Sequence, residues 1–319
     1  MALFARANHP YAVARVAAKR ARLLPPAEYG KVLKMDVAEI TRYIQDSAYK
    51  AEVDELASRF TGLDLLEAAL TVNEERTYTQ VRSMLDGEAR RIVDLFLDRY
   101  HYEDLKTLLR GKAAGASRDA LLREMVLEDQ ASYDLFAPLL ADEVRGVAEV
   151  LSALESRPGR PREWAAILRQ VPAGSPLPRY EDALDKAYYA RLLEGLQGSH
   201  QKGAAEVLEF VRREVDTRNL LNAARWVAAG EQGDFADFVV PGGHALRVAD
   251  VLALARARDL EQFAELLADK KLHPSVKEAL AAARASGRLG TFQAAVWRAH
   301  MAELDHLAHL HPLSLVPIL

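Results

Sequence analysis

A stretch of the chain recurs at an offset of 115 residues. The segment 99–115, RYHYEDLKTLLRGKAAG, aligns with 214–230, EVDTRNLLNAARWVAAG, so that Leu105 matches Leu220 and Arg110 matches Arg225. The closing Ala-Ala-Gly is the same in both segments. Matches on both sides of this pair indicate an internal duplication, which constrains the fold more than any single motif does.

Further matches extend the duplication in both directions. Glu67 and Leu70 align with Glu181 and Leu184 at an offset of 114, and the segment 292–296 aligns with 180–184 at an offset of 112. Helical solenoid units are only ~33 to ~47 residues long. The sequence therefore predicts three similar helical domains, with bounds 1–122, 123–240 and 241–319, in a pseudo-three-fold arrangement that leaves a central axis.

The residue pattern predicts an all-α fold. Apolar residues recur at helical spacing over 88–112, before Gly115, and over 208–227, before Gly230. The weak strand candidate at 238–240 leads directly into Pro241. Proline clusters break the helical pattern, and the segment 156–178 is predicted to be a long connection and a candidate boundary.

The composition excludes several classes of protein. Half of the residues are hydrophobic and 28% are charged, which indicates a folded globular chain. The net charge of −4 argues against nucleic-acid binding, which needs clustered lysine and arginine. There is no cysteine for a disulfide or a thiolate site, and no stretch approaches the ~20 apolar residues of a membrane span.

Catalytic and metal-binding motifs are missing from the sequence. Gly111 and Lys112 are followed by Ala113, so this glycine-lysine pair does not fit a phosphate-binding loop, which needs serine or threonine there. His306 and His309 have a spacing compatible with metal binding, with surface or partly buried histidines as the alternative. We expect no catalytic residue, no cofactor and no metal.

The order and spacing of the repeated segments resemble a known family. The second copy has EDALDKAYY at 181–189, EVDTRNL at 214–220, and Arg225. The first copy has YAVARV at 11–16 and DLKTLLRGK at 104–112. Together these segments resemble the C subunit of A-type ATP synthases, whose eukaryotic V-type counterpart is the d subunit, over essentially the whole chain.

The resemblance implies a mechanical role. Members form a funnel of three helical domains that sits on the cytoplasmic face of the proteolipid ring and grips the foot of the central rotor shaft. It implies one copy per complex, peripheral contact with the membrane, and no catalysis. Because the family's third copy continues beyond the HPLSLVPIL at 311–319, the third repeat is expected to be truncated. The alternative is a generic helical scaffold that binds another protein.

A basic cluster is predicted near the N-terminus. Arg15, Lys19 and Arg22 are spaced at i, i+4 and i+7 on an expected first helix, and no acidic residue occurs before Pro26. Such a run is commonly a solvated face. The alternative is a surface that meets an acidic partner or the lipid headgroups around the ring.

Arg110 and Arg225 are the second set of candidate interface residues, because they occupy the same position in two repeats. One interpretation is that each pairs with a carboxylate and packs its stem between helices. The other is a polar ring that faces the shaft. The same alternatives apply to Asp104 and Asn219, which also match in the alignment.

Overall fold

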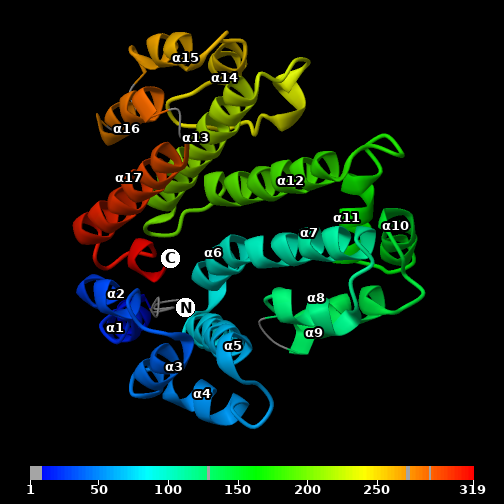
Figure 1. Cartoon of the computed structure of the whole chain (residues 1–319), viewed down its shortest axis with the longest axis vertical. Helices are drawn as coiled ribbons and strands as arrows, with labels where there is room; N and C mark the ends of the chain where they lie inside the picture. Colours follow the sequence, from blue (N-terminus) through cyan, green and yellow to red (C-terminus); the bar gives the residue numbers. More distant parts are fainter. Residues whose placement is uncertain (1–8, 128–129, 271–273, 287–288) are drawn as a thin grey trace, which may run out of the picture. The chain divides into compact units, whose positions relative to one another are not determined.

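The computed structural model describes residues 9–127, 130–270, 274–286 and 289–319. Within these ranges the regular secondary structure is helical throughout, with no strand, as Figure 1 shows. The all-α prediction is confirmed. The strand candidate is not: Phe238 ends a short 3-10 helix, and the two valines after it are irregular.

Contacts divide the chain into two compact units, and the division falls between Arg162 and Glu163. This position is inside the segment predicted as a boundary. The three-repeat bounds 1–122, 123–240 and 241–319 stay a prediction. The helices of the first unit are α1 His9–Arg20, α2 Pro26–Val32, α3 Val37–Gln45, α4 Lys50–Leu56, α5 Gly62–Ser83, α6 Gly87–Leu97, α7 Arg99–Ala113, α8 Arg118–Glu124, α9 Gln130–Phe136, η1 Ala137–Leu140 and α10 Val147–Glu155.

The first long helix of this unit packs on two short ones. A capping box starts α3, because the Asp36 carboxylate accepts from the Glu39 amide at 2.8 Å and the Glu39 carboxylate accepts from the Asp36 amide at 2.9 Å. Buried side chains of α3, α4 and α5 then form one apolar cluster, which includes Ile44, Val53 and Leu65. The cluster fixes the start of α5 against the α3–α4 pair.

The prediction of a long connection over 156–178 is wrong for the middle of that segment. Helix α11, Arg160–Leu168, lies inside it and runs across the division between the two units. Pro161 falls in the first turn of α11, where a missing amide hydrogen removes no helical hydrogen bond. The proline therefore favours the start of this helix, whereas its place in a proline cluster predicted a break.

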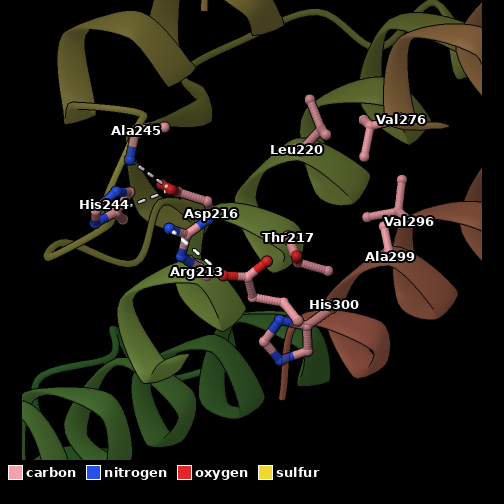
Figure 2. Close-up of a pocket in the computed structure, with 11 residues that line it drawn as sticks. Arg213, Asp216, Thr217, Leu220, His244, Ala245, Val276, Val296, Ala299 and His300 are labelled. Carbon is pink, nitrogen blue, oxygen red and sulfur yellow. Dashed lines mark hydrogen bonds and ion pairs between the residues drawn. The ribbon is translucent and has the colours of Figure 1, made fainter. Parts of the chain in front are cut away.

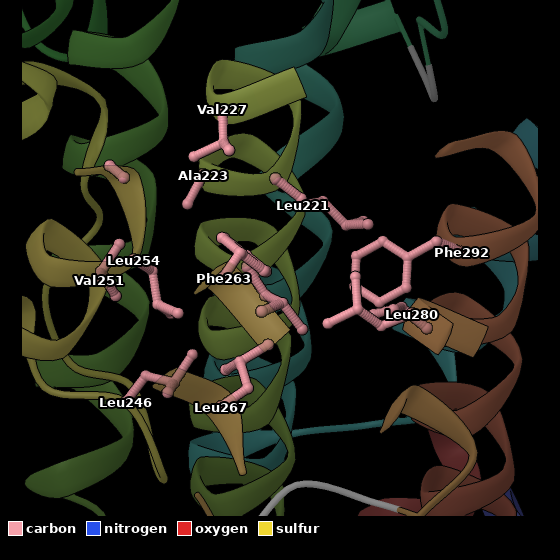
Figure 3. Close-up of a cluster of buried hydrophobic side chains, with 14 of the residues drawn as sticks. Leu221, Ala223, Val227, Leu246, Val251, Leu254, Phe263, Leu267, Leu280 and Phe292 are labelled. Carbon is pink, nitrogen blue, oxygen red and sulfur yellow. The ribbon is translucent and has the colours of Figure 1, made fainter. Parts of the chain in front are cut away.

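The second unit is built around α13. Its helices are α12 Leu177–Gln197, α13 Ala204–Ala229, η2 Phe235–Phe238, α14 Val248–Ala255, α15 Leu260–Leu267, α16 Pro274–Ser286, α17 Leu289–Leu310 and η3 Val316–Ile318. Buried residues occur on every side of α13, because α12, α14, α15 and α17 all pack on it. Figure 3 shows apolar side chains of α13 facing Phe263 and Phe292, both fully buried. Gly230, in the left-handed conformation at φ 66°, ends the helix where the sequence predicted.

The helix order repeats between the units. Helix α5 begins at Gly62 and α12 begins at Leu177, 115 residues later, and the two contain 22 and 21 residues. In each copy, the long helix follows two short ones. The α6–α7 segment corresponds in the same way to α13. The first copy is interrupted at Asp98, so the single helix predicted over 88–112 is two helices there, whereas α13 is continuous.

In both matched segments, the last long helix packs on a short helix that follows it in the chain. Within the first unit α7 contacts α10, and within the second unit α13 contacts α14. The helices α10 and α14 thus complete the core of the copy before them. This explains why the compact units do not end at the predicted repeat bounds.

Candidate functional site

The basic cluster lies at and just after α1. Arg15 and Lys19 are one turn apart on the helix, Arg15 exposed and Lys19 half-buried. Arg22 is exposed but follows the helix end, and its amide donates to the Lys19 carbonyl at 2.9 Å in a tight final turn. The expectation of three residues on one helix is therefore wrong for Arg22. Within the described ranges none of the three forms an ion pair.

Arg110 and Arg225 both extend outward, from α7 and α13. Arg110 Nη2 donates to Thr107 Oγ1 at 3.3 Å, and Arg225 Nη2 donates to Gln293 Oε1 at 2.6 Å. Within the described part of the chain, Arg225 thus pairs with an amide of α17 and with no carboxylate. Neither guanidinium is buried, and the role of the pair in an interface stays a prediction.

Asp104 and Asn219 are buried, with 2% and 1% of their surface exposed. Asp104 Oδ1 accepts from the Val126 amide at 2.7 Å. Asn219 Oδ1 accepts from the Val240 amide at 2.9 Å, and its Nδ2 donates to the carbonyl of the same residue at 2.8 Å. Both side chains hold the backbone that follows the next short helix. Their burial excludes them from a polar ring at the surface.

A buried polar group at Asp98 had no signal in the sequence pattern. His101 Nδ1 lies 3.1 Å from Asp98 Oδ1, His101 Nε2 lies 3.0 Å from Ser132 Oγ, and Arg160 forms an ion pair with the same carboxylate. Burial raises the pKa of Asp98, but the His101 hydrogen bond and the Arg160 charge outweigh it and hold that pKa below its ordinary value. Asp98 and Ser132 are 5% and 3% exposed, and we assign this group a structural role.

The loop 241–247 is fixed by a second buried carboxylate. Asp216 accepts from the amides of His244, Ala245 and Leu246 at 3.0, 2.6 and 3.1 Å, and Figure 2 shows the first two of these contacts. Burial raises the pKa of Asp216 although these amides oppose the rise. Gly243 is required here, because a Cβ at this position would lie 2.1 Å from Asp216 Oδ1.

The cavity beside this loop is small. It has a volume of ≈ 60 Å³ between α13, α17 and the loop, and His300 lines it. The His300 ring stacks on Phe210 with centroids 4.3 Å apart. Of the other C-terminal histidines, His309 contacts the Asp305 carbonyl and His311 contacts Glu206. In the described part of the chain these rings do not converge, and no group of three potential metal ligands occurs.

Comparisons with known proteins decide the family. Residues 12–319 match the family described as ATP synthase (C/AC39) subunit. The chain belongs to this family. It is 31% identical over 312 residues to the C subunit of the A-type ATP synthase of Haloferax volcanii, a match that spans 98% of this chain and 87% of that protein. It is 32% identical over 314 residues to that of Methanosarcina mazei, spanning 98% and 83%.

Membership of the ATP synthase (C/AC39) subunit family agrees with the resemblance stated from the sequence and with a non-catalytic subunit of an A-type ATP synthase complex. Within the described ranges, every helix is too short or too polar to cross a bilayer. Family membership does not say which side chains meet other subunits. For that, Arg15, Lys19, Arg22, Arg110 and Arg225 remain the candidates.

Proposed function

We propose that the chain is the central-stalk coupler of an A-type ATP synthase, joining the membrane proteolipid ring to the rotor shaft on the cytoplasmic side. The observation that carries this proposal is the family match over residues 12–319. One copy per complex would transmit torque from ion flow to the catalytic head, for ATP synthesis or for ion transport. The protein would make and break no bond itself.

The helical architecture supports a mechanical role. Long helices α5, α12 and α13 are each held by neighbouring helices inside a compact unit, and buried polar contacts such as Asn219 to Val240 fix the intervening backbone. Close-packed interiors have low compressibility and transmit strain. A part built in this way can carry load between two partners.

Co-purification tests the proposal. The tagged chain should retain the detergent-solubilised proteolipid ring and, in a separate assay, the purified shaft subunits. Binding of neither partner would overturn the coupling role and favour the generic helical scaffold. Binding of only one would reduce the proposal to an accessory subunit.

The basic cluster offers a sharper version of this test. Charge reversal of Arg15, Lys19 and Arg22 to glutamate should weaken ring binding, and the loss should shrink as salt is raised. The matched control reverses three exposed arginines elsewhere, Arg162, Arg256 and Arg298. If both triple variants bind the ring like the unmodified chain, the α1 charges belong to a solvated face.

A further inference from the structure

The same groove occurs in both copies of the repeat. In the first unit it lies between the end of α4, the first half of α5, and α8, with a volume of ≈ 650 Å³. In the second unit it lies between the end of α11, the first half of α12, and η2, with ≈ 330 Å³. Lining residues match at the 115-residue offset: Leu56 with Val171, Asp64 with Arg179, Ala68 with Ala183, Thr71 with Lys186, Val72 with Ala187, and Leu122 with Asp237.

An ion pair crosses each groove, with the charges exchanged. In the first groove Arg123 of α8 lies 4.0 Å from Asp64 of α5, and both side chains are more than half exposed. In the second groove Asp237 of η2 lies 2.7 Å from Arg179 of α12. Exposed ion pairs contribute little to stability, and the pair with the longer distance contributes less. The first groove is therefore only weakly bridged.

A long side chain of α12 also fills part of the second groove. Lys186 occupies the position of Thr71, and its Nζ donates to the Ala236 carbonyl of η2 at 3.3 Å. A long side chain thus bridges from α12 to η2 where the first groove has a short threonine. Together with the closer ion pair, this explains why the second groove is half as large.

The lining of the first groove indicates what it could hold. Its apolar side chains are Leu56, Phe60, Ala68, Val72 and Leu122, and all of them are buried or half-buried. Its charged side chains are four acidic and two basic: Asp64, Glu67, Glu75, Asp119, Arg59 and Arg123. The volume lies within the ~300–1,000 Å³ of binding pockets. An apolar floor with an acidic rim complements a segment that has basic residues around an apolar one.

We propose that the groove between α4, α5 and α8 binds a basic, apolar-centred segment of a partner protein. Binding displaces the weak Arg123–Asp64 contact, places the apolar side chain on Phe60 and Val72, and sets lysine or arginine against Glu67. The second groove, which the Arg179–Asp237 ion pair crosses, does not bind this segment. The first groove can act in this way whether or not the chain couples the ring to the shaft.

A labelled short peptide of lysine, leucine and alanine is the probe, and a peptide with glutamate in place of lysine is its counterpart. Fluorescence anisotropy with the full chain should show binding of the basic peptide alone. Hydrogen exchange should then slow at α5 and α8. Equal binding of the acidic peptide, or protection at other helices, would overturn the proposal.

Variants separate the groove from non-specific charge. Glu67→Lys should weaken binding about tenfold at low salt, whereas Glu265→Lys, an exposed change on α15, should leave it unchanged. The double variant Asp64→Arg with Leu122→Asp places the residues of the Arg179–Asp237 ion pair at the matching positions of the first groove. It should abolish binding while thermal unfolding stays cooperative. Full binding by Glu67→Lys, whose exposed side chain allows normal folding, would refute the proposal even if the double variant does not fold.

The partner arm of the experiment uses purified shaft subunits and the solubilised ring. Glu67→Lys should lose about tenfold in affinity for one of them. If the unmodified chain binds neither, the coupling function fails while the peptide result still decides the groove. If the chain binds both and Glu67→Lys changes neither affinity, the segment that binds the groove belongs to neither the shaft subunits nor the ring.

Discussion

The two copies of the repeat use different side chains, at matching positions, to hold the backbone that follows a short helix. Asp104 in the first copy accepts from the Val126 amide, whereas Asn219 in the second both accepts from and donates to Val240. An ionised carboxylate can only accept, but a side-chain amide matches a whole peptide unit. Both positions hold the backbone that returns to the long helix, and each side chain suits the peptide group that it meets.

The largest loss of stability should follow truncation of the buried leucines that come directly after these two positions. Leu105 and Leu220 occupy matching positions and are 0% and 1% exposed. Leu105→Ala and Leu220→Ala should each lower the free energy of unfolding by about 2–5 kcal/mol. Denaturant unfolding followed by hydrogen exchange should place each loss in its own unit. Uniform loss over both units would show that the copies unfold as one.

Exchanging the residue types at positions 104 and 219 should lower stability by unequal amounts. Asn219→Asp loses the donor to the Val240 carbonyl and buries a charge, so stability should fall by about 2–3 kcal/mol. Asp104→Asn keeps an acceptor for the Val126 amide and should cost less than Asn219→Asp. Thermal unfolding of both variants measures the difference. Equal losses would mean that the two positions are not chemically distinct.

Acid should destabilise the two copies to different extents, because the first has Asp98 at the position that Arg213 occupies in the second. The folded-state pKa of Asp98 is lowered, so its contribution to stability is present above the unfolded value, near 4, and is lost as the pH falls through the folded pKa. Unfolding of the first unit between about pH 5 and pH 2 should therefore be less pH-dependent in Asp98→Asn. An unchanged pH profile would remove Asp98 from the acid response.

The smallest effects should come from the exposed arginines shared by the copies. Arg110→Ala and Arg225→Ala should each change stability by less than about 0.5 kcal/mol, since neither side chain is buried. Affinity for the shaft subunits, measured by titration, is the informative quantity. A loss for both variants would support a shared polar ring, and a loss for one would break the equivalence.

Much of the architecture could be predicted because it depends on local pattern. Helical periodicity and the glycine at 230 located α13 and its end, and the 115-residue offset anticipated the correspondence of α5 with α12. The break at Asp98 could not be predicted, because it accompanies an ion pair with Arg160, a residue far along the chain. Helix α11 was missed for the opposite reason: Pro161 has two local meanings, and only the structure selects helix initiation.

The interface candidates depended even more on distant partners. The alignment matched positions 104 and 219, but it could not tell a surface residue from a buried one. The partners Val126 and Val240 are contacted only because the chain returns after α8 and η2. The grooves beside those short helices had no signal in any single segment, since each is formed by three.

The packing of α7 on α10 and of α13 on α14 joins helices from the two sides of a predicted repeat bound. The predicted bounds near 122 and 240 each lie between two such helices, inside one compact unit. The division between the units falls instead within the second copy, at the start of α11. Each of these helix contacts therefore contributes to the core of a single unit.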